Sequence, residues 1–477
     1  MNKIIKTIIH LKLFSIITIT QLGLINLVHG DELNAPQESN RVAIVVNKYL
    51  KQEIEDNLSI YLQDLKNEGY EPILKEWDLE NDPAPQALKA YLKGLYVEEG
   101  SLQGAVFIGD LPIPIMEADP LLKATKDNSS LGPTEISNGY IAERYYMDLV
   151  GKEWIDKDNN YKFEEPDYQS YWESFLKILG YDTPEGLRNA IEIEDIYPIP
   201  EIWTSRIVTS TLTYLFKQSE GKLVNAYLVK NHGYRTNKAV FQTQALIYSL
   251  PDVMKNEKAF HASEFIKAKH ILSRNYEIKE PIPGPAYIYE FFEPLSSESY
   301  EIIFWGRHGL KTEILIGLQY LKSSTSSSDG RYLRNQDMRR FGSSMGTSLT
   351  DTHVHIKTAF VFAASCWIGH YTEPAYFAGS YLFNEQFYAF GMLTATLPTY
   401  DDPETLSTMS KLVDGSNFGL ALKKAFETPY YFSLFFTSPA LLSSKIASSN
   451  SKYILGDGTL KLQSRKLVTS EETKNKL

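Results

Sequence analysis

Two short apolar segments constrain the fold of this chain most strongly, because each ends abruptly in small or reactive residues. The first, residues 302–309, reads IIFWGRHG, and the second, residues 359–369, reads AFVFAASCWIG. Both faces of each segment are apolar, which is typical of buried strands in a parallel sheet. Because ligands bind beyond the carboxyl ends of such strands, we expect His308 and Cys366 to lie at one sheet edge.

The N-terminal part of the chain alternates strand and helix patterns. Apolar runs predict strands at residues 41–46, 70–77 and 104–109, and apolar residues at helical spacing predict helices at 52–67 and 86–97. Gly69 is expected to close the first helix. A β-α-β-α-β order with short links indicates a parallel sheet with right-handed crossovers.

Further elements follow the same pattern after residue 200. We expect strands at residues 201–208, 238–247 and 391–397, and helices at 211–231 and 419–426. The chain is too long for one core, since cores stop growing near ~250–300 residues. The sequence therefore predicts an α/β protein with a mostly parallel sheet flanked by helices, in more than one part.

The first 30 residues have the pattern of a secretory signal. Lys3 and Lys6 precede the apolar stretch 13–28, and small residues precede Asp31. A signal of this kind implies a secreted or extracytoplasmic protein, in the periplasm or at the cell surface, with no membrane association after cleavage. The alternative is an uncleaved membrane anchor, for which the apolar run is short against the ~20 residues of a span.

The overall charge argues against one class of partner. The chain carries 48 Lys and Arg against 59 Asp and Glu, a net charge of −11, and no basic footprint for nucleic acid is present. It contains a single cysteine, Cys366, so it forms no internal disulfide. A lone thiol in an exported protein is either buried and inert or a reactive group.

Cys366 and His308 form the candidate catalytic pair. A cysteine nucleophile needs a base to become a thiolate, and the pKa of histidine suits that task. Backbone N–H groups of Gly309 and Cys366 offer two donors for an oxyanion on an attacked carbonyl. The alternative is an inert cysteine together with an ordinary core histidine. The dipeptides His308-Gly309 and Ser365-Cys366, each ending an apolar strand, favour the catalytic interpretation.

The chain resembles the gingipain-like cysteine peptidases, within the superfamily of caspases, legumain, clostripain and separase. That superfamily carries His-Gly and Ala/Gly-x-Cys at the ends of successive strands, as in His308-Gly309 and Ala364-Ser365-Cys366. Five weaker motifs of the gingipain-like branch are similar in order: GAVFIGD at 104–110, EIWTSRI at 201–207, CWIG at 366–369, FGLALKK at 418–424 and LGDGTL at 455–460. Ser205 replaces a glycine of the branch, and Gly458 replaces a proline.

The resemblance implies a caspase-like fold and a cysteine endopeptidase. Cys366 would be the nucleophile, His308 the general base and then acid, and the amides of Gly309 and Cys366 the oxyanion hole. The intermediate would be a thioester on a polypeptide substrate, and no cofactor is required. Members cut after Arg, Lys, Asp or Asn, and the sequence leaves this choice, propeptide processing, oligomeric state and any third residue orienting His308 open.

The resemblance and the proline-rich stretch 281–285 together suggest a domain division. We expect a signal at residues 1–30, a flexible start at 31–40, an N-terminal α/β subdomain at 41–285, a caspase-like catalytic domain at 286–465 and a disordered tail at 466–477. A catalytically silent, gingipain-like secreted or surface binding protein is the alternative function.

Two further clusters suggest metals. Asp156, Asp158 and Asn160 place oxygen ligands on alternate positions of a loop, as calcium loops do, and Tyr161 follows where the turn favours glycine. A structural calcium site and a solvated polar turn are both open interpretations. His353 and His355 would share one face of a strand as a metal pair. They lack a third ligand at a convincing spacing, so ordinary histidines are favoured over a metal-dependent hydrolase.

Overall fold

A computed structural model describes most of the chain beyond residue 38. The described residues are 39–98, 102–117, 139–151, 154, 156–158, 160–164, 199–249, 258–279, 295–306, 309–310, 313–316, 331–334, 355–397, 403–427 and 439–463. The predicted signal at 1–30, most of the flexible start, the tail at 466–477 and the boundary at residue 285 lie outside this set. These four expectations stay predictions.

A large sheet organises the described residues from Arg41 onward, and it contains ten strands within those residues. In their order across the sheet, the strands are β2 (Glu71–Trp77), β1 (Arg41–Asn47), β3 (Leu102–Ile108), β7 (Trp203–Ile207), β16 (Lys452–Gly456), β15 (Gly391–Ala395), β14 (Lys357–Ala364), β10 (Ser299–Gly306), β8 (Gln244–Ser249) and β9 (Glu277–Lys279).

The sheet consists of two parallel halves that run in opposite directions. Strands β2, β1, β3, β7 and β16 are mutually parallel, as are β15, β14, β10, β8 and β9. The halves meet where β15 pairs antiparallel with β16. The predicted α/β class with a mostly parallel sheet is confirmed. Because the strands of the two halves run in opposite directions, the carboxyl ends of one half lie at the same end of the sheet as the amino ends of the other half.

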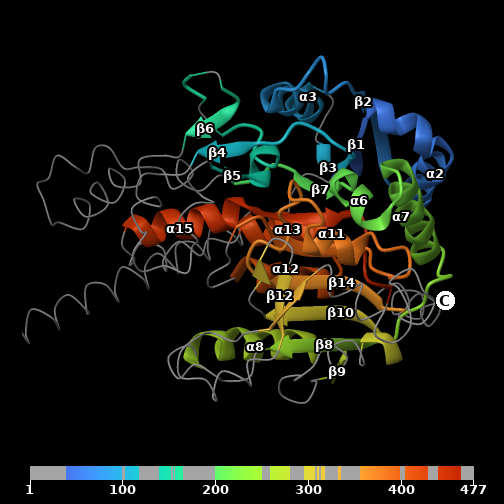
Figure 1. Ribbon diagram of the computed structural model, residues 1–477, viewed down its shortest axis with the longest axis vertical. Coiled ribbons are helices and arrows are strands. Elements are labelled where there is room, and N and C mark those ends of the chain that lie inside the picture. The colour runs from blue at the N-terminus through green and yellow to red at the C-terminus, as the bar shows by residue number, and fades with distance from the viewer. Residues whose placement is uncertain are drawn as a thin grey trace, which may run out of the picture. The chain divides into compact units, whose positions relative to one another are not determined.

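Helices flank the sheet and account for most of the remaining described structure (Figure 1). They are α2 (Lys48–Asn67), α3 (Pro85–Glu98), η2 (Glu143–Tyr146), η6 (Ser210–Leu212), α6 (Thr213–Phe216), α7 (Glu220–Arg235), α8 (Lys258–Leu272), α11 (Phe377–Leu382), α12 (Pro403–Val413), α13 (Phe418–Glu427) and α15 (Pro439–Asn450). Two small sheets also occur: β5 (Tyr140–Ile141), β4 (Ile115–Glu117) and β6 (Lys162–Glu164), and β11 (Gly309–Leu310), β12 (Glu313–Ile316) and β13 (Arg331–Arg334).

Alternate residues of β1 serve two different cores. Ile44 packs in the cluster that includes the buried faces of α2 and α7, which lie side by side in Figure 1. Val45 packs in a second cluster with Leu88 and Leu92 of α3. Side chains of a strand point to opposite faces in turn, so apolar residues at consecutive positions require cover on both faces. The strand is therefore buried between helical layers.

The ends of α2 agree with the sequence signals. Asn47 caps its start, because the side-chain oxygen accepts the N–H groups of Tyr49 at 2.9 Å and Leu50 at 3.3 Å. Gly69 follows its end with a φ of 89°, the left-handed conformation that glycine adopts without a steric cost. The predicted closure of this helix at Gly69 is confirmed.

Two predicted elements differ from the structure. The helix expected at 211–231 is broken into η6, α6 and α7, because Lys217 adopts a left-handed φ of 53° and Ser219 caps a new helix through the N–H of Lys222 at 3.3 Å. The strand expected at 238–247 begins only at Gln244. The N–H groups of Lys238 and Ala239 instead bond to the carbonyl of Gly233, at 2.8 and 3.0 Å, and close α7.

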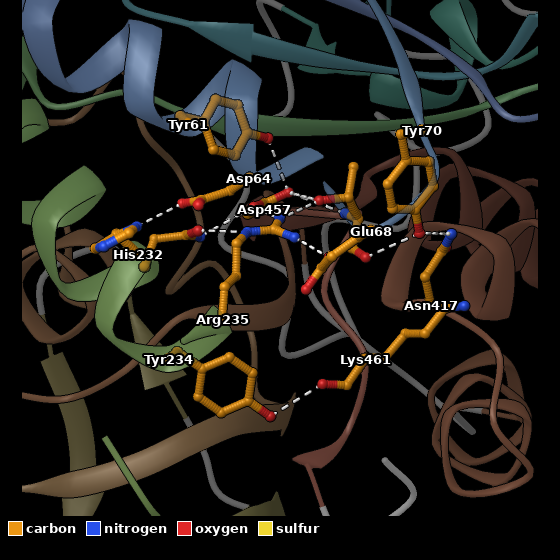
Figure 2. Close-up of polar contacts among 12 residues, drawn as sticks. Tyr61, Asp64, Glu68, Tyr70, His232, Tyr234, Arg235, Asn417, Asp457 and Lys461 are labelled. Carbon is orange, nitrogen blue, oxygen red and sulfur yellow. Dashed lines mark hydrogen bonds and ion pairs between the residues drawn. The ribbon is translucent and has the colours of Figure 1, made fainter. Parts of the chain in front are cut away.

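A buried carboxylate fastens the C-terminal segment to two helices (Figure 2). Asp457, which follows β16, is fully buried and accepts hydrogen bonds from Tyr61 at 3.1 Å, Asn231 at 2.9 Å and Arg235 at 2.6 Å. The N–H of Thr459 also donates to it, at 2.9 Å. A charge buried this deeply is tolerated only when it is paired and hydrogen-bonded. The segment LGDGTL is therefore a structural clamp between α2, α7 and β16.

Replacing Arg235 with Met should destabilise the protein by about 3–5 kcal/mol, because it leaves the Asp457 carboxylate buried without its cation. Burial alone would raise the pKa of Asp457, but Arg235 and Thr459 hold it below its ordinary value. Asp457 therefore contributes stability above its unfolded pKa that is lost as pH falls through the native value. Chemical denaturation should show the R235M deficit shrinking below about pH 4.

The matched control is Arg41→Met, which removes an arginine from a more exposed pair with Glu71 at 3.7 Å. Exposed pairs contribute about 0–1 kcal/mol, so this variant should stay near wild type at every pH. Equal losses in R235M and R41M would contradict the assignment of Asp457 as a buried clamp.

Candidate functional site

The strands that carry the two predicted catalytic residues are neighbours. β10 and β14 pair in parallel, and their last paired residues are Gly306 and Ala364. Cys366 follows Ala364 by two residues, and His308 follows Gly306 by two residues in the sequence. Both strands are buried along almost their whole length. The expectation of adjacent parallel strands is met, whereas His308 itself lies outside the described residues.

Cys366 lies half-buried at the start of a tight turn beyond β14. Trp367, the next residue, has a φ of 54°. This left-handed conformation is costly for a bulky side chain and persists only where the surroundings enforce it. The N–H groups of Trp367 and Gly369 donate to Leu397 at 3.3 Å and Ala395 at 3.1 Å, so the turn is bonded to the carboxyl end of β15.

A steric constraint explains why glycine occupies position 369, the last residue of the CWIG motif. A Cβ added to Gly369 would lie 2.6 Å from the methyl carbon and 2.7 Å from the hydroxyl oxygen of Thr394 on β15. Any larger residue would push the turn away from the strand, so glycine is required here. Ser365, beside the thiol, is buried, and within the described part of the chain its hydroxyl has no hydrogen-bond partner.

The chain after this turn is bonded to the opposite half of the sheet. The hydroxyl of Thr211 donates to the carbonyl of Tyr371 at 2.9 Å, and the N–H of Ala375 donates to the carbonyl of Thr211 at 3.0 Å. The hydroxyl of Tyr376 donates to the carbonyl of Val208 at 2.8 Å. The segment 371–376 is thus fixed to the residues that follow β7.

A buried ion pair lies beneath this segment. Arg206 on β7 donates from Nε to Oε1 of Glu143 at 2.6 Å, and the hydroxyl of Tyr371 donates to the same oxygen. All three residues are at most 2% exposed. Burial disfavours the charge of Arg206, but Glu143 and Tyr371 raise the pKa of its guanidinium above the ordinary value. Burial also raises the pKa of Tyr371, so its hydroxyl stays protonated and donates.

The other resembled motifs have structural roles. Trp203 of EIWTSRI is fully buried, and a Cβ on Gly104 or Gly419 would lie 2.2 Å from its ring. Ser205 and Gly458, which replace a glycine and a proline of the branch motifs, are hydrogen-bonded to each other. The hydroxyl of Ser205 accepts the N–H of Gly458 at 3.0 Å. Proline has no N–H to donate, so glycine at 458 and serine at 205 form a compatible pair.

The predicted oxyanion donors are only partly described. Gly309 begins the short strand β11 and pairs with Ile314 of β12. The N–H of Trp367 is already bonded to Leu397, which removes it from the possible donors. The amides of Gly309 and Cys366 therefore stay predictions as oxyanion donors.

The predicted calcium loop folds around its own backbone. Asp156 accepts the N–H groups of Asn160 and Tyr161, both at 3.0 Å, and Asp158 accepts the N–H of Asn160 at 3.2 Å. Tyr161 has a φ of 65°, so it adopts the left-handed turn for which the sequence signal favours glycine. The carboxylate oxygens suit Ca²⁺ in type, and each retains lone-pair capacity beside these bonds. Calcium binding here stays a prediction.

The histidine pair gains no support from the described residues. His355 is exposed ahead of β14, and His353 lies outside the described residues. Among the described residues, no group of three or more His, Cys, Asp or Glu side chains is arranged to hold a metal ion. In the same part of the chain, no helix is long and apolar enough to span a bilayer.

Sequence analysis missed the polar residues that support the Cys366 turn. Glu143 follows a segment without a strong periodic pattern, and Tyr371 is one of 31 tyrosines. Arg206 lay within a recognised motif, but nothing in the sequence paired it with either residue. Contacts between positions separated by 63 and 228 residues leave no local signal.

Comparison with solved structures identifies the fold. The crystal structure of the Arg-specific cysteine proteinase gingipain R (RgpB) matches with a TM-score of 0.51 and 14% sequence identity, covering 90% of this chain and 80% of that chain. The complex of Porphyromonas gingivalis RgpB pro- and mature domains matches with a TM-score of 0.50 and 13% identity, covering 89% of this chain and 80% of that chain. The chain therefore has the gingipain, caspase-like fold, as its motifs predicted. The sequence matches no family model and no curated protein.

If Asp156, Asp158 and Asn160 bind calcium, millimolar Ca²⁺ should raise the melting temperature, because a ligand that binds only the native state stabilises it by about 2.7 kcal/mol at 100 Kd. Thermal unfolding after chelation and Ca²⁺ addition measures the shift. Asp156→Asn should abolish it, and Mg²⁺ at equal ionic strength controls for screening. A melting temperature indifferent to Ca²⁺ would leave the loop as a solvated turn.

Proposed function

We propose that this chain is a cysteine endopeptidase that hydrolyses peptide bonds through Cys366 and His308. The register of β10 and β14 carries the proposal. Gly306 and Ala364 are paired at the ends of adjacent parallel strands, and His308 and Cys366 each follow two residues later in the sequence, which supports placing both at one end of the sheet. Parallel strands lie about 4.8 Å apart, within the reach of two side chains that turn toward each other. A thiol and an imidazole at this spacing have the requirements of a nucleophile and its base.

The proposed reaction proceeds through a thioester. His308 takes the proton of the Cys366 thiol, and the thiolate attacks the carbonyl carbon of the scissile peptide bond. Two backbone amides, those of Gly309 and Cys366, stabilise the resulting oxyanion. His308 then protonates the leaving amine, and the thioester carries the acyl part of the substrate. Water, deprotonated by His308, attacks the thioester and restores the thiol.

Several observations support the nucleophile assignment over an inert cysteine. Cys366 is half-buried rather than enclosed, so a substrate carbonyl has access to it. The residue after it is held in a left-handed conformation, and such strained residues cluster at functional sites. The fold match to gingipain R extends over most of the chain. We further propose that the enzyme acts outside the cytoplasm on polypeptides, after removal of residues 1–30.

Replacing Cys366 with Ala should lower kcat for peptide hydrolysis by at least about 10⁴-fold, because no other group replaces the nucleophile. Peptide-library cleavage by purified residues 31–477 measures the loss and also defines the residue preferred before the cut. Ser365→Ala is the matched control, since it removes one polar atom from the neighbouring position, where the hydroxyl bonds to none of the residues that the structure describes. Hydrolysis that persists in C366A would refute the assignment of the nucleophile.

The rival functions give different responses. A thiol-alkylating agent should inactivate the peptidase but leave a binding protein or a metal-dependent hydrolase unaffected. Chelation should abolish a metal-dependent hydrolase that uses His353 and His355, without removing peptidase chemistry. Binding of a polypeptide without cleavage, by wild type and C366A alike, would favour the catalytically silent binding protein.

A further inference from the structure

The turn after Cys366 is strained and therefore depends on its attachments. Trp367 adopts a φ of 54°, and a bulky residue leaves this conformation unless its neighbours prevent it. On one side, the N–H groups of Trp367 and Gly369 bond to carbonyls at the end of β15, at 3.3 and 3.1 Å. The carbonyl of Ile368 also accepts the N–H of Ala378 of α11 at 2.9 Å, so backbone bonds tie the turn to the end of β15 and to α11.

The second set of attachments comes from the opposite half of the sheet. The hydroxyl of Tyr453 on β16 donates to the carbonyl of Gly369 at 2.6 Å. Tyr371 packs edge-on against Tyr453, with ring centroids 5.5 Å apart at 74°. Its backbone carbonyl accepts from Thr211, and its hydroxyl donates to Glu143. Tyr371 thus connects the turn to two elements outside the half of the sheet that carries Cys366.

Glu143 gives this attachment its rigidity. Its Oε1 accepts from both Arg206 and Tyr371, whereas its Oε2 is buried and has no hydrogen-bond partner among the described residues. Arg206 is fixed in turn by the carbonyl of Pro112 at 3.1 Å and lies 5.2 Å from the Tyr371 ring. Hydrogen bonds to a buried charged group are stronger than neutral ones, so the Tyr371 hydroxyl has a well-defined position.

We propose that Tyr371 is a positioning residue for Cys366: by bonding to the Glu143–Arg206 ion pair, it holds the strained turn in the conformation that presents the thiol. The half of the sheet that contains β7 and β16 thereby contributes to the geometry of a site formed by the other half. This inference rests on the proposed peptidase function for its catalytic consequence, but the position of the thiol is measurable without catalysis.

The test compares Tyr371→Phe with Tyr234→Phe in the full chain. Tyr371→Phe removes only the hydroxyl that reaches Glu143. Tyr234 is also buried, and its hydroxyl donates to the carbonyl of Lys461 at 3.0 Å (Figure 2). Tyr371→Phe loses one hydrogen bond to a buried carboxylate, and Tyr234→Phe loses two neutral ones, because the Tyr234 hydroxyl also accepts the N–H of Gln463 at 3.2 Å. Both melting temperatures should therefore fall. Cys366 is the only cysteine in the chain, so alkylation reports on that thiol alone.

Y371F should lower kcat about tenfold with KM nearly unchanged, since a small displacement of a reacting group mainly costs the chemical step. The alkylation rate of Cys366, measured across pH 5–9, should change by a similar factor. Y234F should match wild type in both measurements. Should Y371F fail to fold, Thr211→Val removes the donor to the Tyr371 carbonyl and should give a smaller change in the same direction.

Equal alkylation rates and equal kcat in Y371F and Y234F would overturn the inference and leave Tyr371 with a structural role only. The failure of the peptidase proposal is a separate outcome. If wild type cleaves no peptide, the alkylation rates of the two variants still decide whether Tyr371 positions the thiol. If wild type cleaves peptides but Y371F does so equally well, only the positioning role is rejected.

Discussion

The parallel pairing of β10 with β14 is the constraint on which the candidate site depends. These strands are bonded in register as far as Gly306 and Ala364, and both are buried between helical layers. A shift of one residue would turn every side chain to the other face and disrupt the packing of both strands in the main hydrophobic core. Cys366 and His308 each follow the last paired residue of their strand by two positions in the sequence, and the proposed site rests on this equal spacing. The proposed chemistry requires only that their side chains turn toward each other there.

Buried ion pairs fasten helices to the half of the sheet that contains β7 and β16. Asp457 follows β16 and is paired with Arg235 of α7, and Glu143 is paired with Arg206 of β7. Removing one member of such a pair leaves an isolated charge in the interior, which costs several kcal/mol. Two of the segments that resemble gingipain motifs contain Arg206 and Asp457. Two others contribute Gly104 and Gly419, which leave room for the buried ring of Trp203. Those motifs therefore maintain the architecture, while the catalytic proposal depends on the residues beyond β10 and β14.

The sequence predicted the parts of the fold that have strong local periodicity. The strands at 41–47 and 357–364 are continuous apolar runs, and α2 has both an N-cap and a closing glycine. The prediction of one continuous helix over residues 211–231 was wrong, because Ser219 caps a new helix inside a stretch whose apolar pattern is helical throughout. The support of the Cys366 turn was not predictable, because Tyr371 and Glu143 meet across 228 residues. The imidazole partner remains a prediction from the motif and the strand register.

The central claim is that the thiol of Cys366 and the imidazole of His308 interact. The pH dependence of the alkylation rate in wild type and in His308→Gln tests this most directly, because Cys366 is the only cysteine. If they interact, wild type should react well below the ordinary thiol pKa of about 8.5, and H308Q should react only as an ordinary thiol ionises. Identical pH profiles in the two proteins would contradict the account.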